Sequence, residues 1–218
     1  MKSILIQDLL QKNCDLENIM LRLKVILFYL ENEDNLKWID QEINGYSKEE
    51  KVPDYRVATL TPYISMVDGI NFYKNILAGY GAVKNSEDLQ KIISYEIRDG
   101  INSVKEDPNL RFYYNDFIRN IFTDSIEGRR AFIVEAYGKI DVGAMDRVRS
   151  VVKNKVLSIL LVLEKKYGSL DNYDPSEISE EEKKEVSQII KNYITMGDNN
   201  TIDNSSLGIT GGIDEKNN

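Results

Sequence analysis

The chain of 218 residues contains no histidine. Without histidine there is no Ser-His-Asp or Cys-His catalytic set, no histidine-ligated zinc, and no imidazole to serve as the usual general base near neutral pH. Any catalysis by this protein therefore depends on carboxylates, lysine, tyrosine or serine.

Cysteine is almost as scarce, because Cys14 is the single one. One cysteine forms neither an internal disulfide nor a paired-cysteine metal site, and such usage is typical of a reducing compartment. Long apolar runs are missing too, since residues 156–163 span less than half of the ~20 residues that cross a membrane. We therefore expect a cytoplasmic protein without a membrane partner.

The charge of the chain is unevenly distributed. The formal net charge is -8, and residues 171–218 hold eleven acidic residues against four lysines, so this segment alone carries -7. The remainder is close to neutral. Because nonspecific binding to a duplex needs a basic surface, we expect nucleic acid not to be a partner, although a local basic patch stays open.

Apolar residues spaced three and four apart predict helices at both ends of the chain. The first three are expected over 4–12, 16–31 and 36–44, with Ser3, Asp15 and Asn35 as their N-caps. Two more are expected over 144–168 and 180–194, the last one opened by a capping box from Ser179 to Glu182.

The middle of the chain favours β-structure, because residues 51–80 are rich in β-branched and aromatic side chains. Asp68-Gly69 predicts a hairpin of strands 57–67 and 70–73, and Pro62 predicts that the first is an edge strand. A helix over 86–104, a short helix after residue 110 and a strand near 131–137 are expected next. The predicted fold is an α-rich α+β fold with an N-terminal three-helix unit, a small antiparallel β element and long C-terminal amphipathic helices.

Composition divides the chain into three expected parts: a helical domain with a β-hairpin insertion over 1–168, an acidic linker and helix over 169–195, and a Gly/Asn-rich tail over 196–218. The tail has two interpretations, a flexible end or a segment that adds short strands to a neighbouring subunit. In the acidic helix, one apolar side predicts a self-assembly interface and hence a homo-oligomer, formed by Val186, Ile189, Ile190 and Tyr193.

Acidic pairs are the first place to look for chemistry once histidine is absent. Asp141 with Asp146, or Asp40 with Glu42, lacks the spacing of a known metal-binding loop, so we predict no metal site. A metal-dependent nuclease remains the alternative function, although Glu135 and Lys139 lie two residues too far apart for its usual Glu-x-Lys pattern. No glycine-rich phosphate loop occurs either, and we expect no cofactor.

Basic residues are densest around the start of the predicted helix 144–168. Arg147, Arg149 and Lys153, together with Arg129-Arg130 and Lys155, either bind a phosphate or RNA or form a solvated face, and we favour the solvated face. The thirteen tyrosines, such as Tyr113-Tyr114, have no basic stripe among them, which favours core or interface positions.

Several short stretches resemble the AbiTii family of bacterial abortive-infection phage defence. These stretches are Ser3–Leu5 with Leu9-Leu10, Trp38–Tyr46, Val52–Arg56, and Val148-Arg149 with Leu163-Glu164. They cover roughly residues 3–165 and leave the acidic helix and the tail outside. The resemblance implies antiphage defence by a helical domain and supplies no catalytic set.

From this resemblance we predict a defence protein that acts as a sensor, effector or assembly module. Its partners are expected to be phage or defence-system proteins. Because no catalytic set is recognisable, we favour a protein that is not an enzyme. Most of the shared residues have structural roles in helix ends and turns. Tyr46 and Arg56 are the exceptions, because a phenol and a guanidinium at a helix end and a strand start are suited to contact a ligand or partner.

Overall fold

The computed structural model describes residues 2–79, 83, 86–124, 131–171 and 178–195. The elements, in chain order, are α1 (Ile4–Leu10), α2 (Leu16–Phe28), α3 (Glu33–Asn44), the 3-10 turn η1 (Asp54–Arg56), β1 (Val57–Asp68), β2 (Asn71–Leu77), α4 (Ser86–Ile93), β3 (Ser94–Glu96), β4 (Phe112–Tyr113), α5 (Asp116–Asp124), β5 (Ala131–Ile140), α6 (Ala144–Tyr167) and α7 (Glu180–Thr195). This is the helix-rich α+β fold that was predicted.

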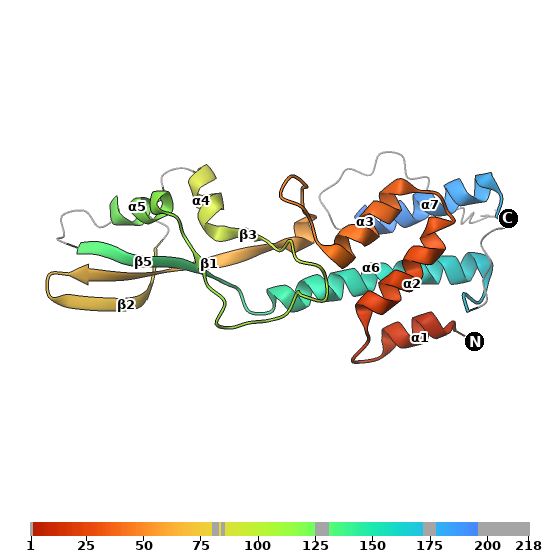
Figure 1. Cartoon of the computed structure of the whole chain (residues 1–218), viewed down its shortest axis with the longest axis horizontal. Coiled ribbons are helices and arrows are strands. Elements are labelled where there is room, and N and C mark those ends of the chain that lie inside the picture. The colour runs from red at the N-terminus through yellow and green to blue at the C-terminus, as the bar shows by residue number, and fades with distance from the viewer. Residues whose placement is uncertain (1, 80–82, 84–85, 125–130, 172–177, 196–218) are drawn as a thin grey trace, which may run out of the picture.

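The molecule is elongated, with two different ends (Figure 1). Helices α1, α2, α3, α6 and α7 form a helical end, whereas the antiparallel sheet with α4 and α5 forms a sheet end. Each end has its own apolar core. None of the described helices has the length and apolarity that crossing a bilayer requires.

Two of the predicted helix caps are confirmed. The side chain of Asp15 accepts a hydrogen bond from the backbone N–H of Asn18 at 3.0 Å, and α2 buries the apolar stripe that its period predicts. At the start of α7, the Ser179 hydroxyl accepts from the Glu182 N–H at 3.3 Å. At both positions, the residues around the start of the helix are sufficient to predict the cap.

Of the other two predicted caps, the one at Asn35 is wrong, whereas Ser3 takes the predicted N-cap position of α1 without a side-chain cap. Asn32, and not Asn35, caps α3, because Asn32 accepts from the Asn35 N–H at 3.0 Å and the helix begins at Glu33. Asn35 is buried and donates its amide to the Ser187 carbonyl at 3.1 Å. Ser3 makes no side-chain cap to α1, since its N–H and its hydroxyl both donate to the Glu164 carboxylate at 2.5 Å.

The sheet has the order β2-β1-β5-β4, and β3 also pairs with β1. The predicted hairpin of β1 and β2 is confirmed, but its turn is shifted by one residue. Asp68 still pairs with Asn71, so the turn residues are Gly69 and Ile70, and Gly69 has a φ of +61°. β5 pairs antiparallel with β1 over nearly its whole length, which confirms the strand expected near 131–137.

Pro62 does not mark an edge, because β1 is a central strand between β2 and β5. The strand pairs with β3 at residues 57–59 and with β2 at residues 63–68, and Pro62 lies in the interval between them. Its carbonyl accepts from the Ala78 N–H at 3.0 Å on that side. Proline has no N–H to donate, and Pro62 therefore occupies the position at which β1 changes its partner from β3 to β2.

The helix expected over 86–104 ends at Ile93, and the chain continues as β3 and a loop. The apolar residues of this stretch serve two cores. Ile92 belongs to the core of the sheet end, whereas Ile97, Ile101 and Val104 are buried in the core of the helical end. Crossing from one core to the other requires an extended chain, which overrides the helical spacing.

Both α4 and α5 lie on one side of the sheet (Figure 1). Ile92 and Phe122 from these helices pack with Ile64, Ile133 and Ala136 of β1 and β5. Because side chains alternate along a strand, the neighbouring residues point to the other face, which we call the tyrosine face. Its residues include Tyr63 and Tyr137 on the central strands and Tyr113 on the edge strand β4.

Gly100 allows the chain after β3 to approach the end of α3. A Cβ atom at Gly100 would collide with the backbone carbonyl of Ile43. We expect Gly100→Ala to lower the free energy of unfolding by about 1–3 kcal/mol, measured by chemical denaturation. Gly79→Ala is the control, since a Cβ there meets nothing within 4 Å, and a loss as small as that of the control would contradict the close approach.

The contact between Ser3 and Glu164 predicts a pH dependence. Hydrogen bonds from Ser3 hold the pKa of Glu164 below its usual value, so this contact stabilises the fold above the unfolded-state pKa and is lost as pH falls through the lower folded-state pKa. We expect Glu164→Gln to reduce the fall in thermal midpoint between pH 7 and about pH 3.5. Glu49→Gln, at an exposed carboxylate, should leave that fall unchanged.

Candidate functional site

A buried ion pair lies where the two ends of the molecule meet. Glu42 in α3 and Arg56 at the end of η1 both have fully buried side chains. The Arg56 Nη2 donates to one Glu42 oxygen at 2.6 Å, and its Nε donates to the other at 3.1 Å. Two charges removed from water in this way need further hydrogen bonds to be stable.

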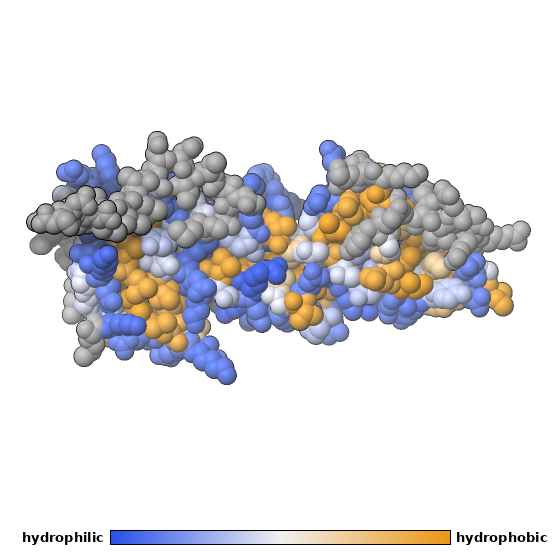
Figure 2. All heavy atoms as spheres, turned by 180° about the vertical axis from the view of Figure 1, so that it is seen from behind, coloured by the Kyte–Doolittle hydropathy of each residue, from blue (hydrophilic) through white to orange (hydrophobic). Residues whose placement is uncertain are grey.

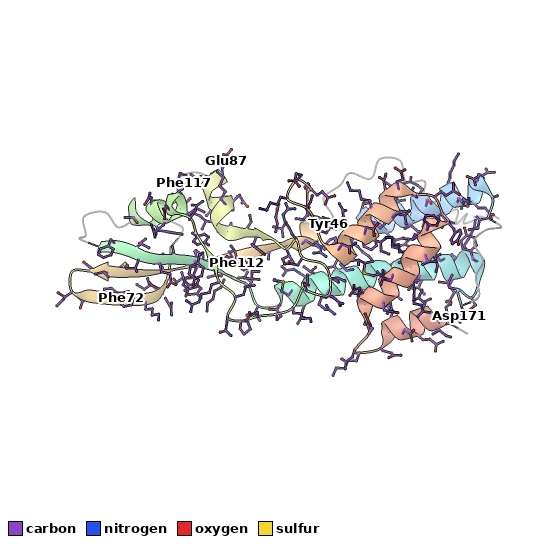
Figure 3. The ribbon with its side chains drawn as sticks, viewed as in Figure 1. Tyr46, Phe72, Glu87, Phe112, Phe117 and Asp171 are labelled. Atoms are coloured by element: carbon purple, nitrogen blue, oxygen red, sulfur yellow. The ribbon has the colours of Figure 1, made fainter. Side chains whose placement is uncertain are left out.

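Two tyrosines and a tryptophan complete the arrangement. The hydroxyls of Tyr46 and Tyr55 donate to the same Glu42 oxygen at 2.6 and 2.7 Å, and the Trp38 indole N–H donates to the Tyr55 oxygen at 3.1 Å. Together with Arg56 these residues form what we call the Glu42 cluster. Figure 3 shows Tyr46 at the junction of the two ends.

Burial and charge shift the protonation of this cluster. Burial and the adjacent Glu42 carboxylate raise the pKa of Tyr46 and of Tyr55 above the usual range, so both phenols stay protonated and act as donors. Burial alone would lower the pKa of Arg56, but its hydrogen bonds and charge contact with Glu42 raise it. The cluster is therefore a closed, fully protonated set of donors around one carboxylate.

The two residues expected to contact a ligand, Tyr46 and Arg56, are thus brought together, and their polar groups bind partners within the chain. The other Arg56 nitrogen, Nη1, donates to the carbonyls of Ile97 and Asp99 at 2.9 and 2.8 Å. The arrangement holds three chain segments together. A ligand role for either residue stays a prediction.

Glu42 is the residue whose role the sequence analysis missed. Trp38 and Glu42 are four residues apart in α3 and so project from one side of it, and Tyr46 follows two residues after the helix ends at Asn44. An acid between two aromatic residues at this spacing is the pattern that points to a buried carboxylate. Its partner, Arg56, was not identifiable from the pattern.

The basic residues of α6 have separate roles. Arg149 donates to the Ile101 carbonyl at 2.8 Å and Lys153 to the Gln11 carbonyl at 3.3 Å, whereas Arg147 is exposed. Buried Lys155 donates to the Ile194 carbonyl at 2.5 Å in the last turn of α7. Arg129 and Arg130 lie outside the described residues. Lys155 is therefore not part of the solvated face that was favoured, and for Arg147, Arg149 and Lys153 both interpretations, a solvated face and a phosphate or RNA site, stay predictions.

The acids of the pair Asp40 and Glu42 bind separate basic partners. Glu42 binds Arg56, whereas Asp40 forms an ion pair with Lys24. Among the described residues, no three acidic or cysteine side chains lie close enough to hold a metal ion. Glu135 contacts Arg111 at 3.8 Å, and the Ser65 hydroxyl donates to it at 3.3 Å.

The apolar side of α7 packs largely within the chain. Val186 and Ile190 are buried in the core of the helical end, so they are not accessible to a second copy. Ile189 and Tyr193 are half-buried and line a groove of about 510 Å³ beside Leu161 of α6. Self-assembly through α7 stays a prediction, and it now rests on Ile189 and Tyr193.

Exposed apolar side chains occur at both ends of the molecule, and Figure 2 shows apolar atoms over both ends of its back face. On α2, Leu21, Val25 and Phe28 are 46%, 61% and 64% exposed. Their spacing of four and three residues places them on one side of the helix, away from the buried stripe. We call this row the α2 stripe, and the sequence analysis did not identify it.

Comparison with known proteins gives one match. The family model named AbiTii matches residues 3–191. The match extends beyond the stretches from which the resemblance was noted and includes most of α7, which those stretches left outside. No curated protein and no solved structure matches the chain.

Because the Glu42 cluster is buried, breaking its ion pair should lower the free energy of unfolding far more than breaking an exposed ion pair does. We expect Glu42→Gln to lower the free energy of unfolding by about 3–5 kcal/mol, because it leaves Arg56 buried without a counter-charge. Asp8→Asn, which breaks the exposed pair with Arg22, should cost less than about 1 kcal/mol. Chemical denaturation measures both.

The double variant Glu42→Leu with Arg56→Met removes both charges and should recover part of the loss. If Glu42→Gln costs no more than Asp8→Asn, the cluster does not hold the junction.

Proposed function

The chain belongs to the AbiTii family of abortive-infection phage defence, and on that premise we propose that it acts in defence through protein contacts made by the α2 stripe. The role is that of a sensor, effector or assembly module in the cytoplasm. A second copy of the chain is the first partner to test, followed by phage and defence-system proteins.

The exposure of Leu21, Val25 and Phe28 is the observation that supports this proposal. Three large apolar side chains in one row on a helix surface are typical of a contact with another protein. Burying such a side chain from full exposure is worth on the order of 1.5–3 kcal/mol. These three are 46–64% exposed, so covering the row gains roughly half of that for each side chain, which in two copies offsets part of the cost of association. The Glu42 cluster, by contrast, is closed to a partner.

A phage challenge of cells that carry the gene tests this function. We expect the native chain to reduce phage yield, and Val25→Glu with Phe28→Glu to abolish that protection, because two carboxylates on the stripe oppose its burial. Light scattering of the purified proteins shows whether the same change dissociates an oligomer.

Leu161→Glu tests the competing surface, because Leu161 is an exposed leucine of α6 that lines the α7 groove. Protection that survives the α2 changes and fails with Leu161→Glu would assign the contact to the groove. Protection that survives both would contradict a role for either surface, provided that circular dichroism shows folded protein.

A further inference from the structure

Aromatic side chains form two rows across the tyrosine face of the sheet. One row crosses β2, β1, β5 and β4, because Leu77 of β2 pairs with Tyr63, Tyr63 with Tyr137, and Tyr137 with Tyr113 of β4. In the other row, Phe72 and Phe132 flank Val67 from either side. These residues come from four separate stretches of the chain.

Cations lie among these rings. The Arg111 guanidinium is 4.5 Å from the centre of the Tyr137 ring, and the Lys139 ammonium is 5.6 Å from the centre of the Tyr63 ring. The Tyr63 and Tyr137 rings are stacked, with 5.7 Å between their centres. In the chain, Arg111 lies two residues before Tyr113 and Lys139 lies two residues after Tyr137, and the pairing of the strands brings these cations and rings onto one face.

The outer members of both rows are accessible. Phe72, Phe132 and Tyr113 are 59%, 58% and 65% exposed. A depression of about 540 Å³ lies at the margin of the face, and its lining includes Phe72, Lys74, Tyr113 and Glu135. Figure 3 shows Phe72 on the hairpin and Phe117 on α5 at the same end of the molecule.

We propose that the tyrosine face binds single-stranded nucleic acid. Exposed rings on a sheet stack unpaired bases, and neighbouring lysine and arginine side chains contact the phosphates. Here Tyr113, Phe72 and Phe132 are the stacking residues, and Arg111, Lys139 and Lys74 are the cations. This ligand goes beyond the proposed function, which concerns a protein partner at the other end of the molecule.

The charges on this face favour a single strand over a duplex. Three cations lie near two acids on this face. Glu135 shares the Arg111 guanidinium at 3.8 Å and accepts from the Ser65 hydroxyl, and Asp141 accepts from the Thr61 hydroxyl at 3.0 Å. Such a small excess of positive charge does not support duplex binding, which rests mainly on phosphate contacts. Stacking on exposed rings requires bases that are not already paired.

Fluorescence anisotropy with labelled oligonucleotides of about 12 nucleotides tests the proposal. The full chain is titrated against single-stranded RNA, single-stranded DNA and a duplex at about 50 mM salt. We expect a dissociation constant of about 1–100 µM for a single strand, and at least tenfold weaker binding of the duplex. The RNA and DNA arms show which strand is preferred.

Single substitutions identify the site. Tyr113→Ala should weaken binding about fivefold or more through lost stacking. Arg111→Ala should reduce the slope of log affinity against log salt by about 0.7, the effect of one phosphate contact. Phe117→Ala is the matched control, because Phe117 is 56% exposed on α5, which covers the opposite face.

Circular dichroism and the thermal midpoint verify that each variant is folded, and Lys139→Ala replaces Arg111→Ala if that variant is not. The proposal is overturned if single strands do not bind at 100 µM protein, or if the duplex binds equally well. It is also overturned if Tyr113→Ala weakens binding no more than Phe117→Ala does.

Discussion

The buried ion pair between Glu42 and Arg56 is the contact on which the rest of the structure depends. Its carboxylate accepts from Arg56, Tyr46 and Tyr55, and the guanidinium also binds the carbonyls of Ile97 and Asp99. Charged groups that are buried away from water are stable only when nearly every donor and acceptor around them is hydrogen-bonded in good geometry. That requirement fixes α3, the start of β1 and the segment after β3 relative to one another.

The two ends of the molecule have separate cores, so their relative orientation depends on this junction. Lys155 extends the junction to α7, because its ammonium lies 5.2 Å from the centre of the Tyr55 ring and binds the Ile194 carbonyl. The stretches that resemble the AbiTii family include every member of the Glu42 cluster. The stretches that carry the resemblance therefore include the residues that join the two ends.

The exposed surfaces differ between the ends in a way that suits two kinds of ligand. The α2 stripe is aliphatic and aromatic and lies on a helix, which suits another protein. The tyrosine face combines rings with cations on a sheet, which suits unpaired bases and phosphates. A rigid junction between them would let a defence protein hold both ligands at a fixed separation.

The sequence by itself determined the helices α2, α6 and α7, the Asp-Gly hairpin and the strand β5, because each depends on spacing and turn residues within a short stretch. It also indicated the family. Only the tertiary structure decided the extended path after Ile93, the central position of Pro62, the burial of Tyr46 and Arg56, and the tyrosine face. Arg56 meets Glu42 across 14 residues, and Tyr63 pairs with Tyr137 on another strand. Patterns within a short stretch carry no information about such partners. The partners lie in separate stretches of the chain and meet only when the helices and strands pack into the two cores.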